Sequence, residues 1–185
     1  MKKLIYIVSA LLAAGALWSC NPDDGSQSTW DRYKDWREAN DTWFAEQETR
    51  MDDDGYPYYV RVTPQWNSGA TVLMHWFNDR EETAGNLIPM LTSTVETRYM
   101  GRLYNDEKFD STAVGDLFTT RVSGVVEGWQ IALMNMNVGD SCEIVFRYPQ
   151  GYGATSTGSI PPYSALRFNM RLVNITGYEI RPPKN

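Results

Sequence analysis

The chain has little of what most catalytic centres require. It contains one histidine and two cysteines in 185 residues. A single histidine excludes a His-rich metal site, so we expect His75, which lies in an apolar run, to be structural. The sequence has no Gly-x-Ser-x-Gly elbow, no Walker loop and no dinucleotide fingerprint. We therefore expect neither a metal nor a cofactor.

Basic residues and long apolar runs are scarce as well. Lys and Arg number 17 against 23 Asp and Glu, for a formal net charge of −6. An acidic chain lacks the electrostatic footprint that phosphate backbones require, so nucleic acid is not an expected partner. The longest apolar run, residues 4–18, is shorter than the about 20 residues that a transmembrane helix needs.

The first 20 residues, "MKKLIYIVSALLAAGALWSC", are typical of a secretory leader. Two lysines precede the apolar run, and small Ser19 precedes Cys20, so residues 1–19 are a predicted signal peptide. The ending "LWSC" resembles a bacterial lipobox, which implies lipidation of Cys20 and anchoring to the outer membrane of the cell envelope, on its periplasmic or its surface-exposed side. Simple secretion and an uncleaved anchor are the alternatives. Loss of Lys2 and Lys3 changes the formal charge to −8.

Residues 20–28 and 29–55 form two segments ahead of the main domain. The first is polar and predicts a lipidated tether. In the second, Ser28 or Thr29 can cap an amphipathic helix that continues to Arg50. Its aromatic stripe either docks on the domain or forms a surface for a protein or glycan partner. One helical face carries Trp30, Tyr33, Arg37, Asn40 and Phe44.

Residues 56–178 show the pattern of one α+β domain, followed by a tail at 179–185. Strand-like alternation occurs before and after a short helical pattern within residues 127–140. This order predicts an antiparallel sheet packed on a central helix. If Cys20 carries lipid, Cys142 has no partner within the chain, and its alternating segment "SCEIVF" predicts a buried strand thiol in preference to a reactive one.

Aromatic residues are the most distinctive candidates for a functional site. They lie beside glycines, at turns or in alternating strands, within three segments of the domain. Together they can line a shallow cavity that binds an apolar ring, although a purely structural core is the alternative. The six are Tyr99, Phe109, Phe118, Trp129, Tyr152 and Phe168.

Three motifs in these segments resemble a known family. "VETRYMGRLYNDEKFDST", "VVEGWQIALMNMNVGD" and "YPQGYGATSTGSIPPYSALRFNMRLVNI" are similar, in order and spacing, to motifs of the FKBP-type peptidyl-prolyl cis-trans isomerases. The resemblance covers about residues 93–175. It implies an FKBP-like antiparallel sheet wrapped around a short central α-helix, with the N-terminal helix as an extension.

The resemblance also implies a prolyl isomerase that acts on proline-containing polypeptides of the envelope or cell surface and binds macrolide inhibitors. Catalytic roles are implied for Tyr99, Phe109, Asp110, Trp129, Tyr152 and Phe168. Substrate contacts are implied for Phe118, Val125, Val126 and Ile160.

One departure from the family pattern is a turn. Where the family has Asp-Gly, this chain has "NDEK" at residues 105–108, without the glycine. A non-catalytic, chaperone-like module that binds proline peptides on the same scaffold is the alternative function. The sequence leaves the oligomeric state open.

Overall fold

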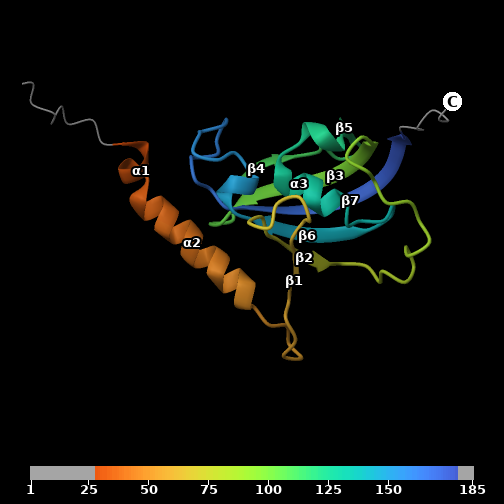
Figure 1. Ribbon diagram of the computed structural model, residues 1–185, viewed down its shortest axis with the longest axis horizontal. Helices are drawn as coiled ribbons and strands as arrows, with labels where there is room; N and C mark the ends of the chain where they lie inside the picture. Colours follow the sequence, from red (N-terminus) through yellow and green to blue (C-terminus); the bar gives the residue numbers. More distant parts are fainter. Residues whose placement is uncertain (1–27, 179–185) are drawn as a thin grey trace, which may run out of the picture.

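The computed structural model describes residues 28–178, and Figure 1 shows them as one sheet with helices on both of its faces. The predicted signal peptide, the lipidation site Cys20, nearly all of the tether and the tail lie outside the described residues. Within residues 28–178 no helix has the length and apolar character needed to cross a membrane. The predicted α+β architecture, an antiparallel sheet with a short helix, is confirmed.

All neighbouring strands of the sheet are antiparallel. Their order is β1-β2-β6-β7-β3-β4, and β5 also pairs with β3. Short 3-10 turns, η1 (Val122–Gly124) and η2 (Tyr148–Gln150), follow β5 and β6. The strands are β1 (Val60–Val62), β2 (Val72–Trp76), β3 (Thr94–Leu103), β4 (Lys108–Ser111), β5 (Phe118–Arg121), β6 (Ser141–Phe146) and β7 (Leu166–Gly177).

The inner face of the sheet is covered by helix α3 (Glu127–Leu133). Successive strand side chains point to opposite faces, so Val72 and Met74 of β2 join the main core under α3, together with Ile144 of β6. The predicted helical pattern extended beyond Leu133, but α3 ends there. Polar side chains offer the chain local partners after that point, since the Asp140 carboxylate accepts from the N–H of Asn137 at 2.8 Å.

The outer face of the sheet carries a second, smaller core beneath the N-terminal helices. Helix α2 (Lys34–Thr49) contributes Phe44, which packs with Tyr59, Leu73 and Val145. The aromatic helix therefore docks on the domain, as one of the two sequence interpretations predicted. It is not continuous, because the backbone of Tyr33 (φ −101°, ψ 22°) separates α2 from α1 (Thr29–Arg32). Ser28 caps α1 as predicted, with its Oγ 3.1 Å from the N–H of Asp31.

The two residues that were predicted to be structural are packed into the sheet. His75 stacks on Tyr58 with ring centroids 3.8 Å apart, and its Nδ1 lies 2.8 Å from the Tyr58 carbonyl oxygen. Cys142 is buried and free, and burial raises the pKa of its thiol well above the usual range. Within residues 28–178 no cluster of three or more His, Cys, Asp or Glu side chains could hold a metal ion.

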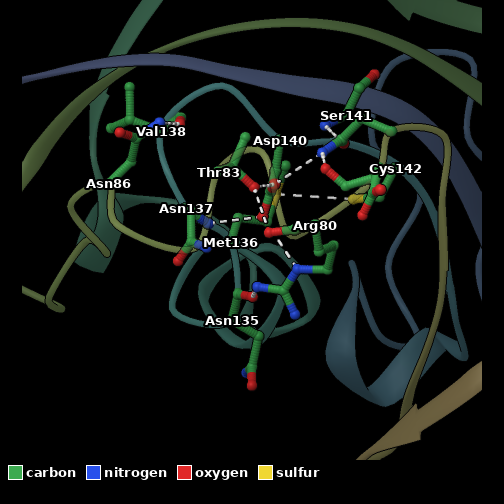
Figure 2. A network of polar contacts seen from close by, with 12 residues as sticks. Arg80, Thr83, Asn86, Asn135, Met136, Asn137, Val138, Asp140, Ser141 and Cys142 are labelled. Atoms are coloured by element: carbon green, nitrogen blue, oxygen red, sulfur yellow. Dashed lines mark hydrogen bonds and ion pairs between the residues drawn. The ribbon is translucent and has the colours of Figure 1, made fainter.

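The loop of residues 77–93, between β2 and β3, is anchored by the buried carboxylate of Asp140 (Figure 2). Thr83 Oγ1 donates to it at 2.5 Å and Asn78 Nδ2 at 3.1 Å. Arg80 Nε lies 3.4 Å from the same carboxylate as an ion pair, although this buried nitrogen makes no hydrogen bond to any described residue. One buried charge with several partners thus fixes a long loop without regular secondary structure.

Candidate active site

An aromatic cavity of about 300 Å³ lies between α3 and the inner face of the sheet. Strands β3, β4, β5 and β7 contribute to its lining, together with α3, η1 and the loop after β6. Nine of the ten residues that the sequence analysis selected for the site line it, and the tenth, Ile160, lies next to it. The lining consists of Tyr99, Phe109, Asp110, Phe118, Gly124, Val125, Val126, Trp129, Tyr152 and Phe168.

Trp129, only 4% exposed, lies at the bottom of this cavity. Its ring meets Tyr99 edge-on at 5.0 Å and Phe168 at 5.2 Å, the offset and perpendicular arrangements that aromatic quadrupoles favour. The preceding residue explains how the helix reaches this depth. A Cβ at Gly128 would lie 2.5 Å from the Phe146 ring, so only glycine lets α3 come this close to the sheet.

The wall formed by Phe109 and Phe168 depends on a second glycine. The two rings are perpendicular, with centroids 5.4 Å apart, and they cover Gly101 of β3. A Cβ at Gly101 would lie 2.5 Å from Phe109 and 2.8 Å from Phe168. Phe118, 36% exposed, completes the aromatic lining at the rim, 5.5 Å from the Tyr99 ring.

Three polar groups face this apolar lining. Tyr99 donates its hydroxyl proton to Asp110 Oδ2 at 2.6 Å, and the N–H of Ser111 donates to Asp110 Oδ1 at 2.8 Å. Burial, and then the hydrogen bond to Asp110, raises the pKa of Tyr99. Burial, and then the charge of Asp110, also raises the pKa of Tyr152. Both hydroxyls therefore stay protonated and can act as donors at neutral pH.

Tyr152 and Val126 hold donors that are not used inside the described part of the chain. The Tyr152 hydroxyl makes no hydrogen bond to residues 28–178, and the side chain is 37% exposed at the rim. Val126 is the N-cap of α3, where backbone N–H groups have no intrahelical acceptor, and its own N–H has no acceptor among those residues. The cavity thus combines an apolar lining with two free donors at its edge.

Ile160, for which the sequence predicts a substrate contact, lies beside this cavity and not in its wall. It lines an adjoining hollow of about 180 Å³ formed by the turn at residues 157–160. The two hollows share Phe109, Asp110 and Tyr152. Gly124, which the sequence analysis did not select, lines the main cavity through its backbone, and an isolated glycine before "VVEGW" is too weak a pattern to identify it.

Comparisons with known proteins agree on one family and one fold. Residues 85–173 match the family model described as FKBP-type peptidyl-prolyl cis-trans isomerase. The chain is 37% identical over 94 residues to the macrophage infectivity potentiator of Trypanosoma cruzi, covering 50% of this chain and 48% of that protein. It is 39% identical over 90 residues to the FKBP-type 22 kDa peptidyl-prolyl cis-trans isomerase of Escherichia coli K12, covering 48% and 44%. The matched region is therefore about half the length of these curated relatives.

Solved structures confirm the fold. A peptidyl-prolyl cis-trans isomerase from Pseudomonas syringae pv. tomato superposes with a TM-score of 0.64 at 24% identity, covering 83% of this chain and all of that one. FkpA from Escherichia coli superposes with a TM-score of 0.53 at 22% identity, covering 78% and 57%.

Proposed function

We propose that this protein accelerates rotation about X–Pro bonds in polypeptide substrates, because residues 85–173 match the family model of the FKBP-type peptidyl-prolyl cis-trans isomerases. The observation that carries the proposal is the aromatic cavity beneath α3, whose lining is large enough for a proline ring and has free hydrogen-bond donors at its rim. We place the isomerase domain at residues 56–178.

Bond rotation explains why a centre without a nucleophile is sufficient. The X–Pro bond resists rotation by about 18–20 kcal/mol because rotation breaks amide resonance, and uncatalysed exchange takes roughly tens to hundreds of seconds. A catalyst must hold the twisted amide more tightly than the planar one. An apolar cavity removes water from the carbonyl and disfavours the charge-separated resonance form. Lowering the barrier by about 5–7 kcal/mol gives roughly a 10⁴- to 10⁵-fold acceleration.

Each site residue selected from the sequence receives a role in this proposal. The proline ring rests on Trp129, and the four rings of Tyr99, Phe109, Phe118 and Phe168 enclose it. Val125, Val126 and Ile160 provide aliphatic contacts to the flanking residues. The Tyr152 hydroxyl and the Val126 N–H, both free as described above, donate to substrate carbonyls. Asp110, held by Tyr99, gives the rotating carbonyl a polar edge.

We further propose that the protein works in the cell envelope, attached to the outer membrane through a lipidated Cys20. The basis is the leader at residues 1–19 and the polar tether at residues 20–28. Its substrates would then be proline-containing envelope or surface proteins, and macrolides would compete with them for the cavity. Labelling with a radioactive fatty acid that is lost on Cys20→Ala tests the anchor.

An assay that follows cis-to-trans conversion of a proline tetrapeptide tests the activity. We expect Trp129→Ala to abolish most of the rate and Tyr152→Phe to lower kcat/KM by about three- to tenfold, the value of one hydrogen bond. Tyr56→Phe is the matched control, since Tyr56 is 69% exposed in the turn before β1 and lines neither hollow. An isomerisation rate equal to that in buffer alone, unaffected by macrolide or by Trp129→Ala, would contradict the proposed isomerase activity. Peptide binding without turnover would favour the chaperone-like module.

A further inference from the structure

Three consecutive residues of the loop at 147–165 are each held by a different residue of the N-terminal helices. The Trp30 ring meets Tyr163 edge-on, with centroids 5.4 Å apart. Trp36 Nε1 donates to Ser164 Oγ at 3.1 Å. The N–H of Ala165 donates to Asn40 Oδ1 at 2.8 Å. These contacts join segments more than 120 positions apart in the chain.

The residues that are held in this way bond directly to the part of the loop that reaches the cavity. The N–H of Tyr163 donates to the carbonyl of Gly153 at 2.9 Å, next to Tyr152. Ser164 Oγ donates to the carbonyl of Pro161 at 2.7 Å, next to Ile160. Among the residues with which this loop lines the two hollows, Tyr152 and Ile160 are therefore each one position from a carbonyl to which a held residue donates.

Asn40 and Tyr163 adopt states that need support from their surroundings. Asn40 is 2% exposed, and its amide is satisfied on both sides because Nδ2 donates to the carbonyl of Trp36 at 2.7 Å. A buried amide without such partners would be strongly unfavourable. Tyr163 has φ of 61°, a left-handed conformation that a bulky residue adopts only where its surroundings impose it.

Helix α2 is fixed to the sheet independently of these loop contacts. Phe44 is buried in the outer-face core with Leu73 and Val145. An ion pair joins Glu48 of α2 to Arg61 of β1 at 2.6 Å. The helix is thus attached to β1, β2 and β6, and it can transmit that fixed position to the loop.

From this geometry we infer that α1 and α2 position the Tyr152 side of the active site, with Trp36 and Asn40 as the positioning residues. This inference rests on the proposed isomerase function and adds a working part to it, because α1 and α2 lie outside the residues that match the family model. Neither residue lines the cavity, so each acts through residues 163–165 on Tyr152. If the Tyr152 hydroxyl is already held in position when the substrate binds, the isomerisation rate rises without any new contact to the substrate.

A double-mutant cycle on the full chain tests this coupling. We expect Asn40→Ala to lower kcat/KM by roughly fivefold, because a small displacement of a positioned group has large kinetic effects. In that background the effect of Tyr152→Phe on kcat/KM should fall to less than about twofold, since residues coupled through a shared backbone shift are not additive. Phe118 lies on the opposite rim, so the reductions in kcat/KM caused by Phe118→Leu and by Asn40→Ala should multiply in the double mutant. A Tyr152→Phe effect of the same size in both backgrounds would overturn the inference.

Two further variants separate positioning from loss of folding. Trp36→Phe keeps an aromatic ring but removes the indole donor, and we expect it to lower kcat with little change in KM. Gln47→Ala is the matched control for Asn40→Ala: Gln47 lies on the same helix and donates to the carbonyl four residues back, at 3.4 Å, without contacting the loop. A rate reduction by Gln47→Ala equal to that by Asn40→Ala would indicate a general role of the helix in stability and refute positioning.

Amide hydrogen exchange gives a readout that does not need activity. The N–H groups of Tyr163 and Ala165 are donors in the contacts above, and we expect their exchange to accelerate about tenfold or more in Asn40→Ala and to stay unchanged in Gln47→Ala. If the wild-type protein has no isomerase activity but this exchange pattern is found, the proposed function fails while the structural coupling stands. Unchanged exchange in Asn40→Ala contradicts the coupling itself.

Discussion

Two long loops leave the sheet at opposite ends, and they are ordered by different means (Figure 1). The loop at 77–93 is fixed from within the domain by the buried Asp140 carboxylate and its partners Asn78, Arg80 and Thr83. The loop at 147–165 is held instead by the N-terminal helices, through Trp36 and Asn40. Only the second loop reaches the aromatic cavity.

Because the two loops are anchored differently, we expect one anchor to affect the stability of the protein and the other its activity. A buried, multiply bonded charge is rigid and expensive to disturb, which suits a loop that has only to close the fold. A docked helix holds its loop with single hydrogen bonds and ring contacts, each of modest energy. Changes in the first anchor should therefore be seen in the free energy of unfolding, and changes in the second should be seen in the rate.

Removal of the Asp140 carboxylate should have the largest effect on stability. Asp140→Ala leaves Arg80 and several buried donors without their acceptor, and we expect a loss of about 4 kcal/mol in the free energy of unfolding. Urea denaturation measures this loss. The kcat/KM of the folded fraction should stay within about twofold of wild type, because the 77–93 loop does not line the cavity. A large fall in kcat/KM would show that the two loops are not separate in function.

Truncation of Phe44 should come next, and it should affect both properties. Phe44→Ala removes the ring that docks α2 on Leu73 and Val145, at a cost of about 3 kcal/mol. Because the helix then loses its attachment to the sheet, kcat/KM should fall together with stability. Urea denaturation and the peptide assay, made on the same preparation, check both. Full activity in a destabilised Phe44→Ala protein would contradict the role given to α2.

A smaller effect is expected from the partner of Asp140 that is simplest to replace. Thr83→Val keeps the shape of the side chain but removes the hydroxyl that donates to Asp140 at 2.5 Å. Hydrogen bonds to charged groups support a loss of about 2 kcal/mol. Thermal unfolding measures it, with Thr49→Val as control, since Thr49 lies exposed at the end of α2. Equal shifts in both variants would show that the Asp140 network adds nothing specific.

The smallest effect concerns pH. The pKa of Tyr99 and that of Tyr152 are raised above the ordinary value of about 10, mainly by burial. A raised pKa stabilises the folded protein below the unfolded value, and this contribution is lost as the pH rises through the folded value. We therefore expect no decline in kcat/KM or stability from tyrosine ionisation below about pH 10. Tyrosinate absorbance and the peptide assay across the alkaline range check this, and titration of Tyr152 at lower pH would contradict it.

Much of the fold and the site could be predicted from local sequence. Alternating strands, a short helical pattern and the order of three motifs were sufficient for the antiparallel sheet with its helix, because each depends on residues close in the chain. The aromatic lining was predictable for the same reason, since Phe109 and Trp129 lie within distinctive motifs. Asp106, where the family has glycine, adopts φ of 68°, a conformation that Asp tolerates better than most residues.

Features that depend on distant contacts were harder to predict. The Asp140 carboxylate accepts from the nearby Asn137 N–H after the end of α3, and its bond to Thr83 forms only when residues 77–93 are folded against it. The displacement of Ile160 into the adjoining hollow depends on the turn at residues 157–160. Asn40 appeared in the sequence as one polar residue in an aromatic stripe, with no pattern to indicate its partner.

The sequence by itself determined the resemblance to one family, the strand pattern and the aromatic composition of the cavity, because these depend on residue identity and spacing. The tertiary structure alone decided that the N-terminal helices hold the 147–165 loop while Asp140 holds the 77–93 loop. Both arrangements depend on hydrogen bonds and packing between segments that are far apart in the chain, and local propensities carry no information about which of those segments will meet.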